Sequence, residues 1–204
     1  EKLFKARNYQ KKWEQAEPGK DPKWDPKMEI LVRVLKREIP LRAHAHTADD
    51  IMTAVRIAEE FSVAIVIEHC TEGHKIAPIL AEKQIPAVVG PSLTTRSKVE
   101  LKDRTFDTLR ILSEAGVKFA ITMDHPVIHS QYLPISAALA VKHGLPREEA
   151  LRALTLYPAQ ILGIDDRYGS LVQGKMADMV LWDGDPLDLQ SRVKKVFIHG
   201  QQVI

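Results

Sequence analysis

Runs of apolar residues alternate with amphipathic segments through the middle of the chain. Four runs are apolar along almost their whole length: IPLRAH (39–44), VAIVIEHC (63–70), IPAVVGP (85–91) and VKFAITMD (117–124). The first three are each followed by a stretch with apolar residues at helical spacing, at 48–61, 74–84 and 104–116. Buried strands that alternate with helices are typical of a parallel sheet covered by helices. The pattern predicts an α/β fold with four β/α units, which is half of an eight-stranded TIM-type barrel or a small open sheet.

The segments on either side of these units have a different character. Helices are expected near both flanks, at 1–17, 27–37, 134–143 and 147–156. From Tyr168 onward, short apolar stretches alternate with glycine turns, which indicates a small β unit. The expected organisation is a helical lead-in at 1–38, four β/α units at 39–133, terminal helices at 134–163 and a β portion at 164–204.

Composition limits the expected partners and compartment. The chain has 204 residues and a net charge of +2, which gives no reason to expect nucleic acid or an acidic membrane surface as a partner. No apolar run approaches the ~20 residues that a membrane-spanning helix needs, and no signal-peptide pattern is present. The single cysteine, Cys70, excludes an internal disulfide and suits a reducing compartment, so we expect a cytoplasmic protein.

Residues with metal-ligand chemistry stand at the ends of three predicted strands. His44, His69 and Asp124 are each the last or nearly the last residue of a run. Parallel strands bring such ends to one edge, where barrel enzymes keep their active sites. Two imidazoles and a carboxylate suit Zn²⁺ or a similar divalent ion, which lowers the pKa of a bound water to about 7. His46 follows His44 by two residues and shares its strand face, so these two are a pair of ligands, one ligand with a neighbour, or polar residues of a loop.

Three of the strand-end motifs and the C-terminal segment occur in a fixed order along the chain. They are RAHAH (42–46), VIEHC (66–70), AITMDHP (120–126), EEALRALTLYPAQILGI (148–164) and YGSLVQGKMADMVLWDGDP (168–186). In this order they resemble the amidohydrolase superfamily, and within it the imidazolonepropionase-like group. The resemblance implies that the four units are strands five to eight of a (β/α)8 barrel and that the tail is part of a composite β-sandwich. It also implies a hydrolase that cleaves C–N bonds of a small-molecule amide or cyclic amide with metal-activated water.

The same resemblance implies roles for the strand-end residues. The family has an H-x-H pair on its first barrel strand, but only three strands follow HAH here, so this motif matches the fifth strand. His44 is then the expected metal ligand, and His46 is expected to contact substrate or to hydrogen-bond locally. Asp124 is expected to bind metal and to shuttle the proton. His69 is expected to bind metal or, as a hydrogen-bonding group, to stabilise the developing oxyanion. The metal is expected to be zinc, with manganese, iron and nickel as alternatives.

Part of the family's site has no counterpart in this chain. No H-x-H pair occurs between Glu1 and Pro40, so the sequence resembles the C-terminal half of an amidohydrolase. A half-barrel would leave two sheet edges open, so we expect it to pair with the missing N-terminal half or to self-associate. We expect little hydrolysis by the isolated chain. Two alternatives are a non-catalytic binding or structural protein that retains half of the fold, and an unrelated open α/β protein.

Three further residues lie in loops above the expected site. His74, Arg96 and His129 follow the second, third and fourth apolar runs and are candidate substrate contacts. Arg96 could hold a substrate carboxylate through its two-pronged guanidinium group. Ordinary loop polarity is the alternative explanation for His74. The substrate itself is not identified by the sequence.

Overall fold

A four-stranded parallel sheet forms the centre of the protein. The computed structural model describes all 204 residues. The strands are β1 (Leu41–Ala45), β2 (Ile65–His69), β3 (Ala87–Val89) and β4 (Phe119–Ile121), paired in the order β1-β2-β3-β4. The parallel α/β fold expected from the apolar runs is therefore confirmed. The strand numbers five to eight remain a prediction.

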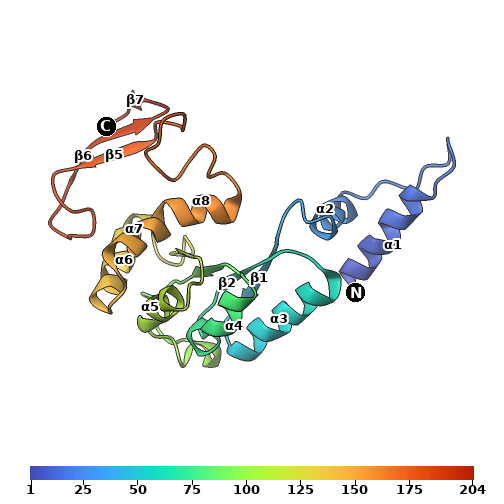
Figure 1. Ribbon diagram of the computed structural model, residues 1–204, viewed down its shortest axis with the longest axis horizontal. Coiled ribbons are helices and arrows are strands. Elements are labelled where there is room, and N and C mark those ends of the chain that lie inside the picture. The colour runs from blue at the N-terminus through green and yellow to red at the C-terminus, as the bar shows by residue number, and fades with distance from the viewer.

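Three helices connect the strands and cover one face of the sheet (Figure 1). They are α3 (Ala48–Phe61), α4 (Ala77–Glu82) and α5 (Asp107–Glu114). Short 3-10 helices also occur in the connections, η1 (Gly73–Lys75) after β2 and η2 (Val99–Leu101) after β3. Ile67, Leu80 and Phe119 are completely buried in the core between this face and the helices. Burying such side chains removes them from water and stabilises the fold by roughly 1.5–3 kcal/mol each.

The turns that lead into the four strands share one backbone motif. The residues after each preceding helix, Arg37, Ser62, Gln84 and Gly116, have φ values of 61°, 55°, 52° and 82°. In each turn the next N–H donates to the carbonyl five residues earlier, as from Ile85 to Leu80 at 2.9 Å. These are the two marks of the Schellman helix end. The same type of helix end therefore precedes each of the four parallel strands.

The opposite face of the sheet is only partly covered. A small apolar cluster forms where Ile161 of α8 (Leu156–Leu162) packs against Val66 and Ala120. On the same face, Arg42 of β1 lies 2.5 Å from a carboxylate oxygen of Glu68 of β2. His44 follows on the same strand face as Arg42 and is exposed.

The remaining elements lie at the two ends of the molecule (Figure 1). The helices α1 (Lys2–Glu14) and α2 (Pro26–Leu35) pack together at one end. η3 (Ser130–Tyr132), α6 (Leu133–Lys142) and α7 (Arg147–Leu154) follow β4, and an antiparallel sheet of β5 (Met179–Trp182), β6 (Val193–Ile198) and β7 (Gln201–Gln202) forms the other end. Arg147 holds this small sheet's loop by two hydrogen bonds to Asp185. The division expected at residues 163 and 164 stays a prediction. None of the helices has both the length and the apolar character needed to cross a membrane.

The outer edges of β1 and β4 have no neighbouring strand. Their free N–H and C=O groups can pair with a further strand. We therefore predict concentration-dependent association of the chain, to be measured by sedimentation equilibrium across a wide concentration range. A chain that stays strictly monomeric at the highest concentration would contradict this prediction.

The turn at Gln84 provides a test of the repeated helix end. Gln84 is exposed and has a left-handed φ of 52°, a conformation that is strained for residues with a Cβ atom but not for glycine. We predict that Gln84→Gly raises the free energy of unfolding by about 0.5–1 kcal/mol in urea titrations, because the relief of strain exceeds the extra flexibility of the unfolded chain. The matched control is Arg56→Gly at an exposed position within α3, which should lower it by about 1 kcal/mol. Equal effects of the two substitutions would refute the assignment.

Candidate metal centre

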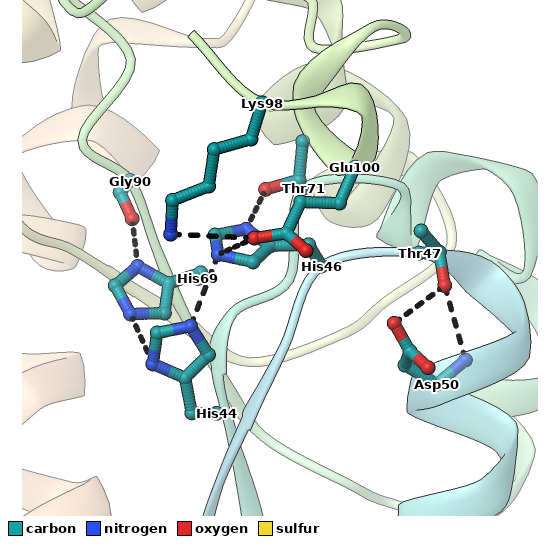
Figure 2. A network of polar contacts seen from close by, with 9 residues as sticks. All are labelled: His44, His46, Thr47, Asp50, His69, Thr71, Gly90, Lys98 and Glu100. Carbon is teal, nitrogen blue, oxygen red and sulfur yellow. Dashed lines mark hydrogen bonds and ion pairs between the residues drawn. The ribbon is translucent and has the colours of Figure 1, made fainter.

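Three histidines meet at the carboxyl end of the first two strands (Figure 2). His44, His46 and His69 each offer a ring nitrogen, and these nitrogens lie within 4.8 Å of one another. No other three histidine, cysteine, aspartate or glutamate side chains come together in this way. The sequence predicted His44 and His69 at one site but assigned His46 to substrate contact. In the structure His46 is a full member of this group, which we call the histidine cluster.

Strand pairing and backbone conformation bring the cluster together. Ala45 at the end of β1 is paired with His69 at the end of β2, so the two strands end side by side. His69 and Cys70 have φ values of 68° and 46°, which ends the regular alternation of β2. Their side chains leave in different directions: the His69 ring lies 4.1 Å from that of His44, whereas Cys70 is buried in the core.

A continuous line of hydrogen bonds runs through the cluster (Figure 2). His69 Nδ1 is 2.7 Å from the carbonyl oxygen of Gly90, and His69 Nε2 is 3.1 Å from His44 Nδ1. His44 Nε2 is 3.1 Å from His46 Nε2. His46 Nδ1 then lies 2.7 Å from Thr71 Oγ1. The rings of His46 and His69 are thus oriented by groups outside the cluster.

The surroundings favour neutral imidazole at His46. Burial, followed by the neighbouring charges that His69 and His44 would carry, lowers the pKa of His46. A carboxylate oxygen of Glu100 lies 3.7 Å from His46 Nε2 and opposes this shift. Lys98 is 3.4 Å from the same carboxylate. A ring that remains neutral keeps a lone pair for a metal ion.

Cys70 is excluded as a fourth ligand by its surroundings. The side chain is completely buried, and burial raises the pKa of its thiol to about 12. Metal ions bind the thiolate form, which is scarce at neutral pH when the pKa is so high. Cys70 is therefore part of the apolar core.

Asp124 lies apart from the histidine cluster in this structure. Strand β4 ends at Ile121, and Asp124 has a φ of 49°, so strand alternation no longer determines its direction. Asp124 is exposed, and its backbone N–H donates to Thr122 Oγ1 at 3.1 Å. The carboxylate is not a member of the group of close metal-ligand atoms.

The three candidate substrate contacts lie in separate places. His74 Nδ1 is 3.0 Å from Thr108 Oγ1 of α5, and burial is the main cause that lowers the pKa of His74. Arg96 donates to the carbonyl oxygen of Arg104 at 3.0 Å and is exposed. His129 is also exposed. None of them belongs to the histidine cluster.

Four residues of the site were not singled out from the sequence. Gly90, Thr71, Lys98 and Glu100 all contribute to the hydrogen bonds and ion pairs around the cluster (Figure 2). They lie in the connections after β2 and β3, with Glu100 in η2, where no periodicity predicts side-chain direction. The only local signal is their position directly after strands that end in the candidate site.

The cluster fits a divalent metal ion. Zinc sites in enzymes often combine three protein ligands, and neutral imidazole is a common one. The hydrogen bond of His69 Nδ1 to a backbone carbonyl is the usual orientation for a metal-binding histidine, since it leaves the lone pair on Nε2. The other imidazole nitrogens of the cluster lie close enough to share one ion after small ring movements.

Comparison with known proteins defines the family. A sequence model described as "Amidohydrolase family" matches residues 28–203. The chain belongs to the amidohydrolase family. The resemblance drawn from the strand-end and C-terminal motifs is thereby confirmed.

Individual proteins of this family extend the comparison. The chain is 30% identical over 176 residues to an imidazolonepropionase of Acinetobacter baumannii, covering 81% of this chain and 42% of that protein. It is 29% identical over 180 residues to amidohydrolase tasK of Hapsidospora irregularis, covering 86% of this chain and 18% of that protein. A crystal structure of an amidohydrolase from Thermotoga maritima matches with a TM-score of 0.96 and 49% identity, over 100% of this chain and 54% of that chain. This chain therefore spans about half of that structure and less of the two curated relatives.

The carbonyl that orients His69 provides a test of the site. Gly90 has a φ of 133°, and an added Cβ would lie 2.2 Å from the carbonyl oxygen of Thr122. We predict that Gly90→Ala displaces this backbone and weakens zinc binding by about tenfold or more, measured by competition with a chromophoric chelator.

The control for this substitution is Gly116→Ala. Gly116 also has a positive φ, of 82°, but an added Cβ would meet nothing within 4 Å. Gly116→Ala should lower the free energy of unfolding without changing the affinity for zinc. If Gly90→Ala and Gly116→Ala bind zinc equally well, the Gly90 carbonyl does not orient the ligand.

Proposed function

We propose that this chain forms part of a metal-dependent amidohydrolase that cleaves C–N bonds of a small-molecule amide or cyclic amide. The observation that carries the proposal is the histidine cluster at the carboxyl ends of β1 and β2, in a chain of the amidohydrolase family. Enzymes built on parallel β/α units bind their substrates at this end of the strands.

A divalent ion at this site would polarise the scissile carbonyl and supply hydroxide near neutral pH. His44, His46 and His69 are the residues that would hold the ion. Zinc suits imidazole ligands best, and manganese, iron and nickel are alternatives. The neutral state favoured at His46 keeps its lone pair available.

Asp124 is the proposed proton carrier. It follows β4 on the side of the sheet where the carboxyl ends of the strands and the histidines lie, because all four strands are parallel. A carboxylate in this place can take a proton from the attacking water and return it to the leaving nitrogen. The proposed second role for Asp124, as a metal ligand, requires its exposed side chain to move toward the cluster.

His69 has two proposed roles that its geometry allows. Its Nδ1 is fixed on Gly90, so Nε2 can ligate the metal or, in protonated form, donate to a developing oxyanion. His74, Arg96 and His129 remain proposed substrate contacts. Each would have to reach the site from its loop when substrate binds.

We further propose that hydrolysis requires more of the barrel than these four strands. The sheet face that carries Arg42 and His44 is open, so substrate would not be shielded from water. The missing surface would come from an N-terminal half or from a second copy across the sheet edges. A purely structural role is less favoured, because the sequence keeps His44, His69 and Asp124, whereas a degraded site usually loses such residues first.

The proposal predicts a specific loss of activity on substitution of Asp124. In a full-length protein that contains this chain, Asp124→Asn should lower kcat for amide hydrolysis by about 10²- to 10⁴-fold, the usual range for an acid–base group. The measurement is steady-state hydrolysis of N-acyl amino acids, dipeptides and cyclic amides with added zinc.

Asp21→Asn is the matched control, because Asp21 lies in the exposed loop between α1 and α2. It should leave kcat unchanged. Near-normal activity of Asp124→Asn, with the fold intact by circular dichroism, would refute the assignment of the proton carrier.

A further inference from the structure

The Gly90 carbonyl determines the direction of the hydrogen bonds in the histidine cluster. A carbonyl oxygen only accepts, so His69 must carry its proton on Nδ1. A neutral imidazole has one N–H, which leaves His69 Nε2 as an acceptor. His44 Nδ1, 3.1 Å away, is therefore the donor to His69.

The same reasoning continues to the other end of the line. With its proton on Nδ1, His44 presents Nε2 as an acceptor, and His46 Nε2 donates to it across 3.1 Å. His46 Nδ1 then has no proton, so the Thr71 hydroxyl donates to it across 2.7 Å. One backbone carbonyl thus fixes four hydrogen bonds in series.

This order makes His46 different from the other two ligands. The nitrogen of His46 that faces the cluster carries a proton, whereas a metal ligand needs a lone pair there. His46 can become a ligand only if its proton moves from Nε2 to Nδ1. Thr71 Oγ1, which donates a hydrogen bond to Nδ1 in the first state, must then accept one from Nδ1.

A hydroxyl group can make this exchange, because it both donates and accepts. We propose that Thr71 is a positioning residue that allows His46 to join the metal, by reversing the direction of its hydrogen bond to His46 Nδ1. The inference rests on the proposed function, since it concerns the same metal centre. The inference goes beyond the proposed function because it assigns a residue outside the cluster to the positioning of His46.

Packing around Thr71 supports a fixed partner for His46. Thr71 is only 7% exposed and His46 only 8% exposed. The next residue, Glu72, donates its N–H to the carbonyl oxygen of His46 at 2.8 Å. Its buried carboxylate accepts the N–H of Ala48 at 2.9 Å, at the start of α3. Glu72 thus joins the backbones that carry Thr71 and His46 by two hydrogen bonds, and the Thr71 hydroxyl can reverse its role by rotation of its O–H bond alone.

The inference is tested by the zinc affinities of three threonine variants of the 204-residue chain. Thr71→Val keeps the shape and removes the hydroxyl, and should weaken zinc binding by about 10- to 100-fold, as expected for a residue that orients a ligand. Thr71→Ser keeps the hydroxyl and should bind zinc like the wild type. Thr108→Val is the control, since Thr108 Oγ1 is bonded to a histidine Nδ1 outside the cluster, at 3.0 Å, and its loss should not change affinity.

Long-range ¹H–¹⁵N NMR of the imidazole rings gives a second measurement that does not depend on affinity. Without zinc, we expect the proton on Nδ1 of His69 and His44 and on Nε2 of His46. With zinc, the proton of His46 should move to Nδ1. If His46 keeps its proton on Nε2 in the zinc-bound wild type, the inference is wrong.

The outcomes separate this inference from the proposed function. A wild-type chain that binds no zinc would overturn both. A wild type that binds zinc, together with a folded Thr71→Val variant of equal affinity, would overturn the role of Thr71 and leave the metal centre standing. Weaker binding by Thr71→Val, restored in Thr71→Ser, with the proton shift at His46, would establish the positioning role.

Discussion

The parallel pairing of β1 with β2 is the constraint on which the rest of the site depends. Ala45 and His69 are partners in this pairing, so two loops begin at the same place. From there His46 reaches Thr71, and Glu72 bonds the carbonyl of His46. The third strand adds the Gly90 carbonyl behind His69. A shift of β1 by one residue along β2 would separate the contacts of His44 and His46 with the β2 side, because it would turn every side chain of β1 to the other face.

The sequence predicted the bounds of an element well where capping residues determine them. The helix expected at 48–61 has those bounds in the structure, because Thr47 accepts the N–H of Asp50 at its start and Ser62 takes the left-handed conformation at its end. The last two strands are shorter than their apolar runs: β3 has three residues and so has β4. Apolar residues beyond a strand still pack in the core, so hydropathy alone does not show where pairing stops.

His46 shows how two kinds of sequence argument can differ. Alternation along a strand placed His44 and His46 on one face and left both open as ligands. The family resemblance favoured a single histidine on that strand. The structure places both rings in the cluster, with His46 one residue beyond the end of β1. For Asp124 the sequence argument fails. We expected its side chain to meet the histidines because it stands at the end of an apolar run, but β4 ends three residues earlier and strand alternation no longer sets the direction of this side chain. Thr71 and Gly90 come from loops, and only the folded chain shows that they orient the rings.

The central claim is that three imidazoles from the ends of two neighbouring strands form a metal site. Its most direct test is the zinc content of the chain by elemental mass spectrometry, after loading with zinc and extensive dialysis, in the wild type and in His44→Ala. The account predicts about one zinc ion per wild-type chain and its loss in the variant, since removal of the central ring leaves only two of the three imidazole ligands. No zinc in the wild type, or the same zinc content in both proteins, would contradict it.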